Sequence, residues 1–315
     1  MTKKLDPQFV ELLRAADEAG IPPIHSMSYK QAREFYTSTS KRLGGKSPNN
    51  LQVTNQIIET GEYPIPIRLY RPEAASDTIL PGLVYLHGGG WCTGDLESHD
   101  HVCRWLASHA ECVVIAVDYR LGPEHKFPAA VDDAYAATKW ICIHASDLML
   151  DPQKIAIGGD SAGGNLSAVV SLLAREQGGP DLSSQLLIYP ATDMLMRYPS
   201  HVLCGDGYRL TRTAIAWFVN GYLRDGVDMY DLRASPLMAK NHNDLPPAFV
   251  MTAGFDPLKD EGEACANKLK EAGVEVKYRC YEGMLHGFIA MPGAIDVARA
   301  ALLDAAGYLK ERFSA

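Results

Sequence analysis

Short runs of apolar residues recur along the chain and are separated by longer amphipathic stretches. Nearly continuous apolar runs occupy residues 79–86, 112–117, 155–158, 185–189 and 248–253. Such runs, without polar alternation, are typical of parallel strands that are buried on both faces of a sheet. The pattern therefore predicts an α/β fold built around a parallel sheet.

Other segments complete this layout. Residues 51–59 and 65–70 are more polar and predict a hairpin at one edge of the sheet, while the alternation over 274–281 predicts a further strand. Apolar residues at helical spacing predict helices over 96–109, 129–144, 164–177, 260–272 and 294–312, and an amphipathic helix within the first 20 residues. Two stretches, 1–50 and about 194–240, do not fit the alternation.

A G-x-S-x-G motif follows the apolar run 155–158, with Ser161 at its centre. This motif is typical of a nucleophile elbow, a tight strand-to-helix turn that lifts a serine hydroxyl clear of the sheet edge. Gly159 and Gly163 are needed there because a Cβ atom at either position would collide with the neighbouring strand or helix. Residues 165–170 continue as a helix, which is the setting that the motif requires.

A second glycine motif, H-G-G-G-W at residues 87–91, follows the apolar run 79–86. Glycines leave backbone N–H groups bare, so Gly88, Gly89 and Gly90 are expected to frame a loop that stabilises a developing oxyanion. Two such motifs in this order predict an enzyme of acyl transfer.

A triad needs an acid and then a histidine downstream of the serine. His286, in a loop after the strand 274–281, is favoured over His201 and His242, which lie in stretches that resemble loops or insertions. Asp256 stands just beyond the apolar run 248–253, at the edge where α/β sites assemble, and Pro257 is expected to open the next helix. Asp256 also suits a helix N-cap, and its rivals Asp260 and Glu261 are expected to point away from that edge.

With these motifs, the chain resembles the hormone-sensitive-lipase-like branch of the α/β-hydrolases, the bacterial family IV esterases. D-Y-R-L-G-P-E at 118–124, F-P-A-A at 127–130, D-P-L at 256–258 and H-G-F at 286–288 fit the same pattern in the same order. The resemblance implies an α/β-hydrolase fold, with a mostly parallel, twisted, eight-stranded sheet flanked by helices and a helical cap. It further implies a core of residues 51–193 and 241–315, with cap segments at 1–50 and 194–240.

The resemblance also implies roles for individual residues. Ser161 is the expected nucleophile, His286 the general base and acid, and Asp256 the group that orients the imidazole. Gly88, Gly89 and Gly90 frame the oxyanion loop, and the N–H of Ala162 is the remaining donor. The sequence leaves open which two glycines donate, although Gly89 is favoured. Large apolar residues of the cap segments are expected either to line an acyl pocket or to form the cap's own core, namely Phe35, Tyr36, Leu203, Tyr208, Leu210, Trp217, Phe218, Tyr222 and Leu223.

The implied function is a serine carboxylesterase that hydrolyses short- to medium-chain acyl esters of small molecules without a cofactor. The same machinery serves amidases and deacetylases, and some relatives of this fold are ligand receptors without catalysis or lyases. A homodimer formed through edge strands or C-terminal helices is expected by analogy. Neither the preferred acyl chain nor the physiological substrate follows from the sequence.

Composition limits the partners and the cellular location that can be expected. The chain has 315 residues and a formal net charge of −8, with no basic cluster, so nucleic-acid binding is not expected. We expect no membrane insertion and no secretion signal, because no long apolar run is present. Seven scattered cysteines favour reduced thiols and a cytoplasmic location. His99 and His101 have no partners at zinc-like spacing, so no metal site is predicted.

Overall fold

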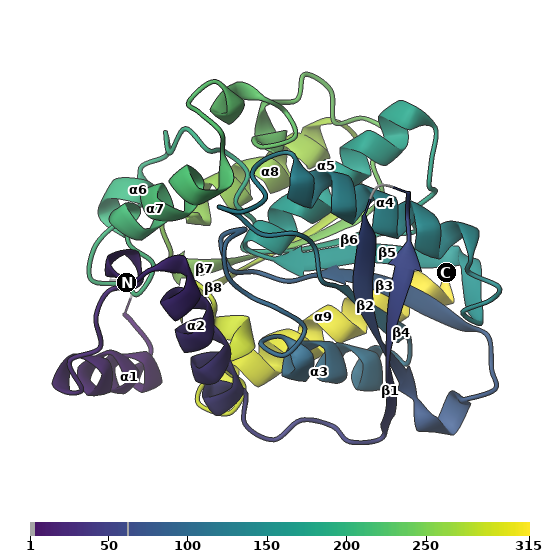
Figure 1. Cartoon of the computed structure of the whole chain (residues 1–315), viewed down its shortest axis with the longest axis horizontal. Helices are drawn as coiled ribbons and strands as arrows, with labels where there is room; N and C mark the ends of the chain where they lie inside the picture. The colour runs from purple at the N-terminus through teal and green to yellow at the C-terminus, as the bar shows by residue number, and fades with distance from the viewer. Residues whose placement is uncertain (1–3, 62) are drawn as a thin grey trace.

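The computed structural model describes residues 4–61 and 63–315. Eight strands form one sheet in the order β1-β2-β4-β3-β5-β6-β7-β8 (Figure 1). Their bounds are β1 (Leu51–Glu59), β2 (Pro64–Pro72), β3 (Leu80–Leu86), β4 (Val113–Val117), β5 (Leu150–Asp160), β6 (Gln185–Ile188), β7 (Ala248–Phe255) and β8 (Val276–Leu285). The eight-stranded α/β-hydrolase sheet expected from the sequence is confirmed.

The sheet is parallel apart from one edge. β1 pairs with β2 and β2 pairs with β4 in antiparallel register, whereas every pair from β4 to β8 is parallel. The predicted edge hairpin and the predicted buried strands are therefore confirmed. Because the carboxyl ends of β3, β5, β6, β7 and β8 all meet at one edge, residues that follow these strands come together there.

Helices cover both faces of the sheet. In Figure 1, α3 (Asp100–Ala110) and α9 (Asp296–Ser314) lie on one face, and α4 (Ala129–Ile143), α5 (Ala162–Gln177) and α8 (Lys259–Glu271) lie on the other. Each layer buries apolar side chains against the strands. All five were predicted from helical spacing. α3 begins later than expected because Asp95 and Ser98 exchange side chain to backbone hydrogen bonds, and this local turn competes with a helix.

Two predicted boundaries near the site were wrong. β8 continues to Leu285, because Leu285 still pairs with Phe255 beyond an irregularity in the ladder, so His286 directly follows the strand. Pro257 does not open α8, which begins at Lys259. Instead, the Asp256 carboxylate accepts the backbone N–H of Leu258 at 2.8 Å in a tight turn that precedes the helix.

The two stretches that break the alternation lie together at one end of the molecule. They contain α1 (Pro7–Glu18), α2 (Tyr29–Gly44), α6 (Ser200–Leu203) and α7 (Arg212–Tyr222) (Figure 1). Tyr29 stacks on Trp217 with ring centroids 4.2 Å apart, so the two stretches touch each other although they are far apart in sequence. The predicted first helix is confirmed over Pro7–Glu18; residues 1–3 lie outside the described residues.

Within residues 4–61 and 63–315, no helix is both long enough and apolar enough to cross a membrane.

Candidate active site

Ser161 stands at the tip of the turn between β5 and α5, with a φ of 56° and a ψ of −115°. A positive φ is unusual for a residue with a side chain and marks the strained elbow that the motif predicts. A Cβ atom at Gly159 or Gly163 would overlap the carbonyl oxygen of Leu86 at the end of β3. The predicted steric need for both glycines is confirmed, since β3 passes directly beside the turn.

The predicted acid and histidine lie beside this serine. His286 Nδ1 is 2.7 Å from Asp256 Oδ2, and His286 Nε2 is 2.8 Å from Ser161 Oγ. Because a carboxylate only accepts hydrogen bonds, Nδ1 carries the proton and Nε2 is left to accept from the serine hydroxyl. Asp256 is fully buried, and its other oxygen accepts the N–H of Leu258, so the carboxylate is held from both sides.

The alternative histidines and acids have other partners. His201 is in helix α6 and not in a loop, and its Nε2 is 2.6 Å from Glu261 Oε2. Glu261 does not point away from the sheet edge as expected: it accepts the N–H groups of Thr192 and Asp193 and lies in the wall of the cavity above Ser161. His242 lines a separate small hollow beside α8.

One N–H group of the glycine loop 88–90 already has a hydrogen-bond partner within the protein. Gly88 donates its N–H to Asp160 Oδ1 at 2.9 Å. Gly89 and Gly90 have φ values of 127° and 60°, which favour glycine, and Thr93 donates both its N–H and its hydroxyl to the Gly89 carbonyl. The loop is therefore fixed in shape before any ligand binds.

Asp160, the residue before the serine, anchors this loop from below. It is 2% exposed and also accepts the Tyr85 hydroxyl at 2.8 Å, with His99 Nε2 at 3.3 Å. Burial opposes its ionisation, but the ionic contact with His99 and the hydrogen bonds from His99, Tyr85 and Gly88 outweigh burial and lower the pKa of Asp160 to about 2. This role could not be predicted from the sequence, because Asp160 stands at an unspecified position of the G-x-S-x-G pattern.

The histidine that opens the glycine loop is a packing residue. His87 stacks on Tyr119 with centroids 4.4 Å apart, and Tyr119 donates its hydroxyl to the His87 carbonyl at 2.7 Å. Burial, with a smaller contribution from His99, lowers the pKa of His87 to about 4. His87 is therefore neutral near pH 7 and supports the loop through its ring and backbone.

A cavity of about 660 Å³ opens above Ser161. Its wall comes from α1, α2 and the stretch 191–219, together with Gly89, Gly90 and His286. Of the apolar residues expected to line a pocket, four do so, namely Phe35, Tyr36, Leu210 and Phe218. The others pack elsewhere or face solvent: Leu203, for example, is 75% exposed, and Tyr222 is fully buried against Trp91.

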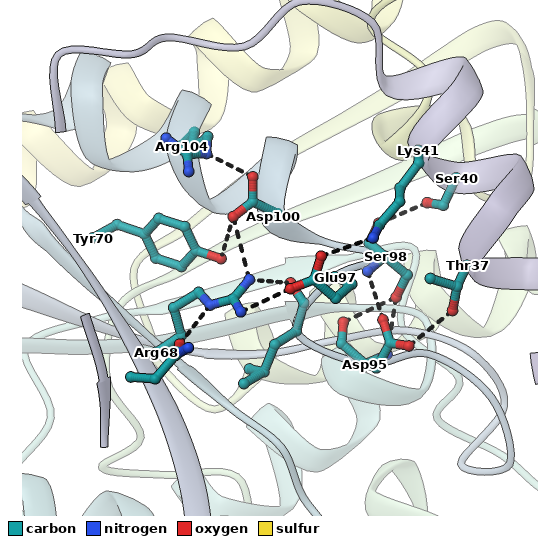
Figure 2. Close-up of polar contacts among 12 residues, drawn as sticks. Thr37, Ser40, Lys41, Arg68, Tyr70, Asp95, Glu97, Ser98, Asp100 and Arg104 are labelled. Atoms are coloured by element: carbon teal, nitrogen blue, oxygen red, sulfur yellow. Dashed lines mark hydrogen bonds and ion pairs between the residues drawn. The ribbon is translucent and has the colours of Figure 1, made fainter. Parts of the chain in front are cut away.

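Helix α2 is fastened to the loop that follows the glycine motif. Figure 2 shows three contacts: Thr37 with Asp95 at 2.8 Å, Ser40 with the Ser98 carbonyl at 2.6 Å, and Lys41 with Glu97 at 2.8 Å. Arg68 of β2 binds Glu97 from the other side at 2.7 Å. This cluster links the wall of the cavity to the loop that carries Gly89 and Gly90.

The sheet order, the elbow and the Ser161–His286–Asp256 chain of hydrogen bonds define a hydrolase of the α/β class. A family model described as an α/β hydrolase fold matches residues 83–290. The chain therefore belongs to this family.

Named relatives narrow the class. The carboxylic ester hydrolase LipN of Mycobacterium tuberculosis is 48% identical over 246 residues, an alignment that covers 76% of this chain and 65% of that protein, less than two thirds of its length. The ethyl acetate hydrolase of Pseudomonas putida is 37% identical, and the alignment covers 92% of each chain. The predicted place among the carboxylesterases of the superfamily is confirmed.

Solved structures agree with this placement. An ester hydrolase from the metagenome of Lake Arreo, solved with a bipyridine phosphonate derivative, superposes with a TM-score of 0.95 at 39% identity and covers 99% of this chain. That match includes 100% of the solved chain. A thermostable esterase from Pseudomonas putida superposes with a TM-score of 0.94 at 34% identity, over 99% of each chain.

Proposed function

We propose that this protein is a serine carboxylesterase that hydrolyses short- to medium-chain acyl esters. The observation that carries the proposal is the chain of hydrogen bonds from Ser161 through His286 to Asp256, which lies at the floor of a largely apolar cavity. The relatives named as ester hydrolases support the same reaction.

The chemistry follows from the positions of the three side chains. Ser161 Oγ attacks the ester carbonyl carbon while His286 Nε2 takes its proton. His286 then gives this proton to the alcohol oxygen as the C–O bond breaks, which leaves an acyl group on Ser161. A water molecule repeats the two proton transfers and releases the acid. Asp256 keeps Nδ1 protonated and stabilises the imidazolium that forms at each step.

The oxyanion of each tetrahedral intermediate is assigned to the N–H groups of Ala162, Gly89 and Gly90. Ala162 is the first residue of α5, so the partial positive charge of the helix N-terminus adds to its N–H. Gly88 is assigned a supporting part, because its N–H is already bound to Asp160. Each donor of this kind typically contributes about 3 kcal/mol to transition-state stabilisation.

We further propose that residues 1–50 and 194–240 act as a two-part cap that selects the acyl chain, since both line the cavity. A cavity of about 660 Å³ favours small and medium-sized esters over long lipids. A cytoplasmic location stays a prediction. So does a homodimer through edge strand β8, which is analogy alone.

The test is hydrolysis of p-nitrophenyl acetate, butyrate, octanoate and palmitate by the wild type, Ser161→Ala and Ser171→Ala. Ser171 is a matched control, because it is a buried serine on the same helix whose hydroxyl bonds only the carbonyl of Ser167. We expect activity on the short esters in the wild type and in Ser171→Ala, and loss of about 10⁴-fold or more in Ser161→Ala. Residual activity within tenfold of wild type in Ser161→Ala contradicts the assignment.

Labelling by a fluorophosphonate separates the alternatives. A reactive Ser161 without ester turnover would point to amides, which p-nitroacetanilide then tests. The absence of labelling in folded wild type would favour a ligand receptor.

A further inference from the structure

One cationic side chain projects into the cavity beside the proposed base. Arg209 is part of the cavity wall, and its Nη1 donates to the carbonyl oxygen of His286 at 3.2 Å. The guanidinium lies so close to Gly287 that a Cβ atom on that glycine would be 2.5 Å from Nη1. The charge is thus held next to the residue that we propose moves the proton.

Arg209 keeps accessible surface, and many protein atoms surround its guanidinium at the cavity wall. Burial lowers the pKa of its guanidinium, with Tyr36 and Tyr189 opposing this effect. Part of the accessible surface of Arg209 belongs to the cavity wall. An arginine remains charged in such a setting.

This charge has no ionic partner in the part of the chain that the structure describes. Among residues 4–61 and 63–315, no carboxylate lies within 4.0 Å of the Arg209 guanidinium. The buried carboxylates in the cavity wall are engaged by other groups, since Asp193 binds Arg197 and Glu261 binds His201. A cation that is partly shielded from water is stabilised when an anion binds it.

The backbone of Arg209 is strained in a way that fixes its direction. Its φ is 60°, and the N–H of Leu210 donates to the carbonyl of Tyr208 at 2.7 Å, which closes a three-residue turn around it. Such turns with a left-handed central residue are rare, and strain of this kind gathers at ligand clamps. Glycine would relieve the strain here, but only a side chain reaches the cavity.

We propose that Arg209 binds a carboxylate on the substrate, so that the site takes esters whose acyl or alcohol part carries a carboxylate group. The planar guanidinium uses one N–H on His286 and keeps the others for a two-point contact with a planar anion. The inference rests on the proposed ester hydrolysis and names the class of ester. The apolar wall around Phe35 and Phe218 then holds the carbon chain between the two ends.

The experiment compares two pairs of esters that differ in charge. Monoethyl succinate against ethyl butyrate places the carboxylate on the acyl side, and acetoxyacetate against propyl acetate places it on the alcohol side. Proton release at constant pH gives kcat/KM for each ester with the wild type, Arg209→Gln, Arg209→Lys and Arg212→Gln. Arg212 is a matched control, because it is an exposed arginine three positions later that does not belong to the cavity wall.

In at least one pair, we expect the ratio of kcat/KM for the carboxylate ester to that for its neutral partner to fall about 10- to 100-fold in Arg209→Gln. Arg209→Lys keeps the charge without the planar fork, so more of the ratio should remain, and Arg212→Gln should keep the wild-type ratio. Ratios in both pairs that stay within twofold in folded Arg209→Gln overturn the inference. Hydrolysis of the neutral esters alone by wild type also overturns it while leaving the proposed function intact. No hydrolysis of any ester by wild type overturns both.

Discussion

Removal of the Asp160 carboxylate tests whether its contact with Gly88 holds the glycine loop 88–90 in place. Asp160→Ala deletes the acceptor of three buried donors, namely the N–H of Gly88, the hydroxyl of Tyr85 and, more weakly at 3.4 Å, the hydroxyl of Tyr189. It also removes the carboxylate that lies 3.3 Å from His99 Nε2. The replaced side chain is 2% exposed, so water cannot easily take its place.

The size of the effect follows from these contacts. A buried donor left without a partner costs about 1–3 kcal/mol, so the two shorter contacts, from Gly88 and Tyr85, give roughly 2–6 kcal/mol of lost stability. Tyr85→Phe removes one of the donors and should cost only about 1 kcal/mol in the wild type. In the Asp160→Ala background the same change removes a group that is already unpaired, so it should cost nothing or restore stability.

The assay is a double-mutant cycle over the wild type, Asp160→Ala, Tyr85→Phe and the double variant. Urea unfolding followed by circular dichroism gives the free energy of unfolding of each, with equal slopes as the condition for comparison. Hydrolysis of p-nitrophenyl butyrate by the same samples shows whether the glycine loop keeps its active shape. We expect kcat to fall at least tenfold in both variants that lack Asp160.

Two results would refute this reasoning. One is additivity, with Tyr85→Phe costing the same in both backgrounds, since it would mean that the hydroxyl does not depend on Asp160. The other is wild-type kcat in a destabilised Asp160→Ala, which would mean that the Gly88 contact does not shape the oxyanion loop.

Two other predictions concern the loop and the response to acid. Gly90→Ala places a Cβ atom on the ring of Phe218 at a position with left-handed backbone, so kcat/KM for p-nitrophenyl butyrate should fall about tenfold or more. Gly226→Ala is the control, because a Cβ atom there meets nothing within 4 Å, and its activity should equal that of the wild type. Equal activities of the two variants would contradict this prediction. Burial lowers the pKa of His101 to about 4, below its unfolded value of about 6.5, so the unfolded chain binds more protons between these pH values and stability should fall by roughly 3 kcal/mol as the pH drops through them. His101→Gln should reduce this fall in urea titrations at pH 7 and pH 4, and an unchanged fall would exclude His101 as a source.

The parts of the site that the sequence predicted depend on short-range constraints. Ser161 and its two glycines belong to one turn, whose steric needs are complete within five residues and the strand beside it. Asp256 and His286 were found because each follows a predicted strand, and parallel strands end at a common edge. The boundaries were less secure, since the end of β8 depends on how long it pairs with β7.

The parts that the sequence did not predict depend on contacts between distant segments. Asp160 gains its importance from Tyr85 and Gly88, both more than 70 positions away. In the sequence, Arg209 is only a charged residue in a loop, and its contact with the His286 carbonyl is visible only in the folded chain. The cavity wall was predicted only in part for the same reason, because the apolar character of Leu210 and Leu203 does not tell which of the two side chains turns inward.

The two-part cap separates the residues of the cavity wall from the proposed catalytic residues along the chain. The proposed catalytic residues follow the ends of core strands, whereas most of the cavity wall comes from the segments 1–50 and 194–240. Each segment contacts one loop of the site: α2 binds the loop after the glycines, and Arg209 binds the backbone of His286. Directed evolution can therefore vary inward-facing positions such as Phe35 and Leu210 freely, provided that it leaves these two contacts alone. A few substitutions at these positions should then change which esters bind, while the Ser161–His286–Asp256 arrangement stays the same.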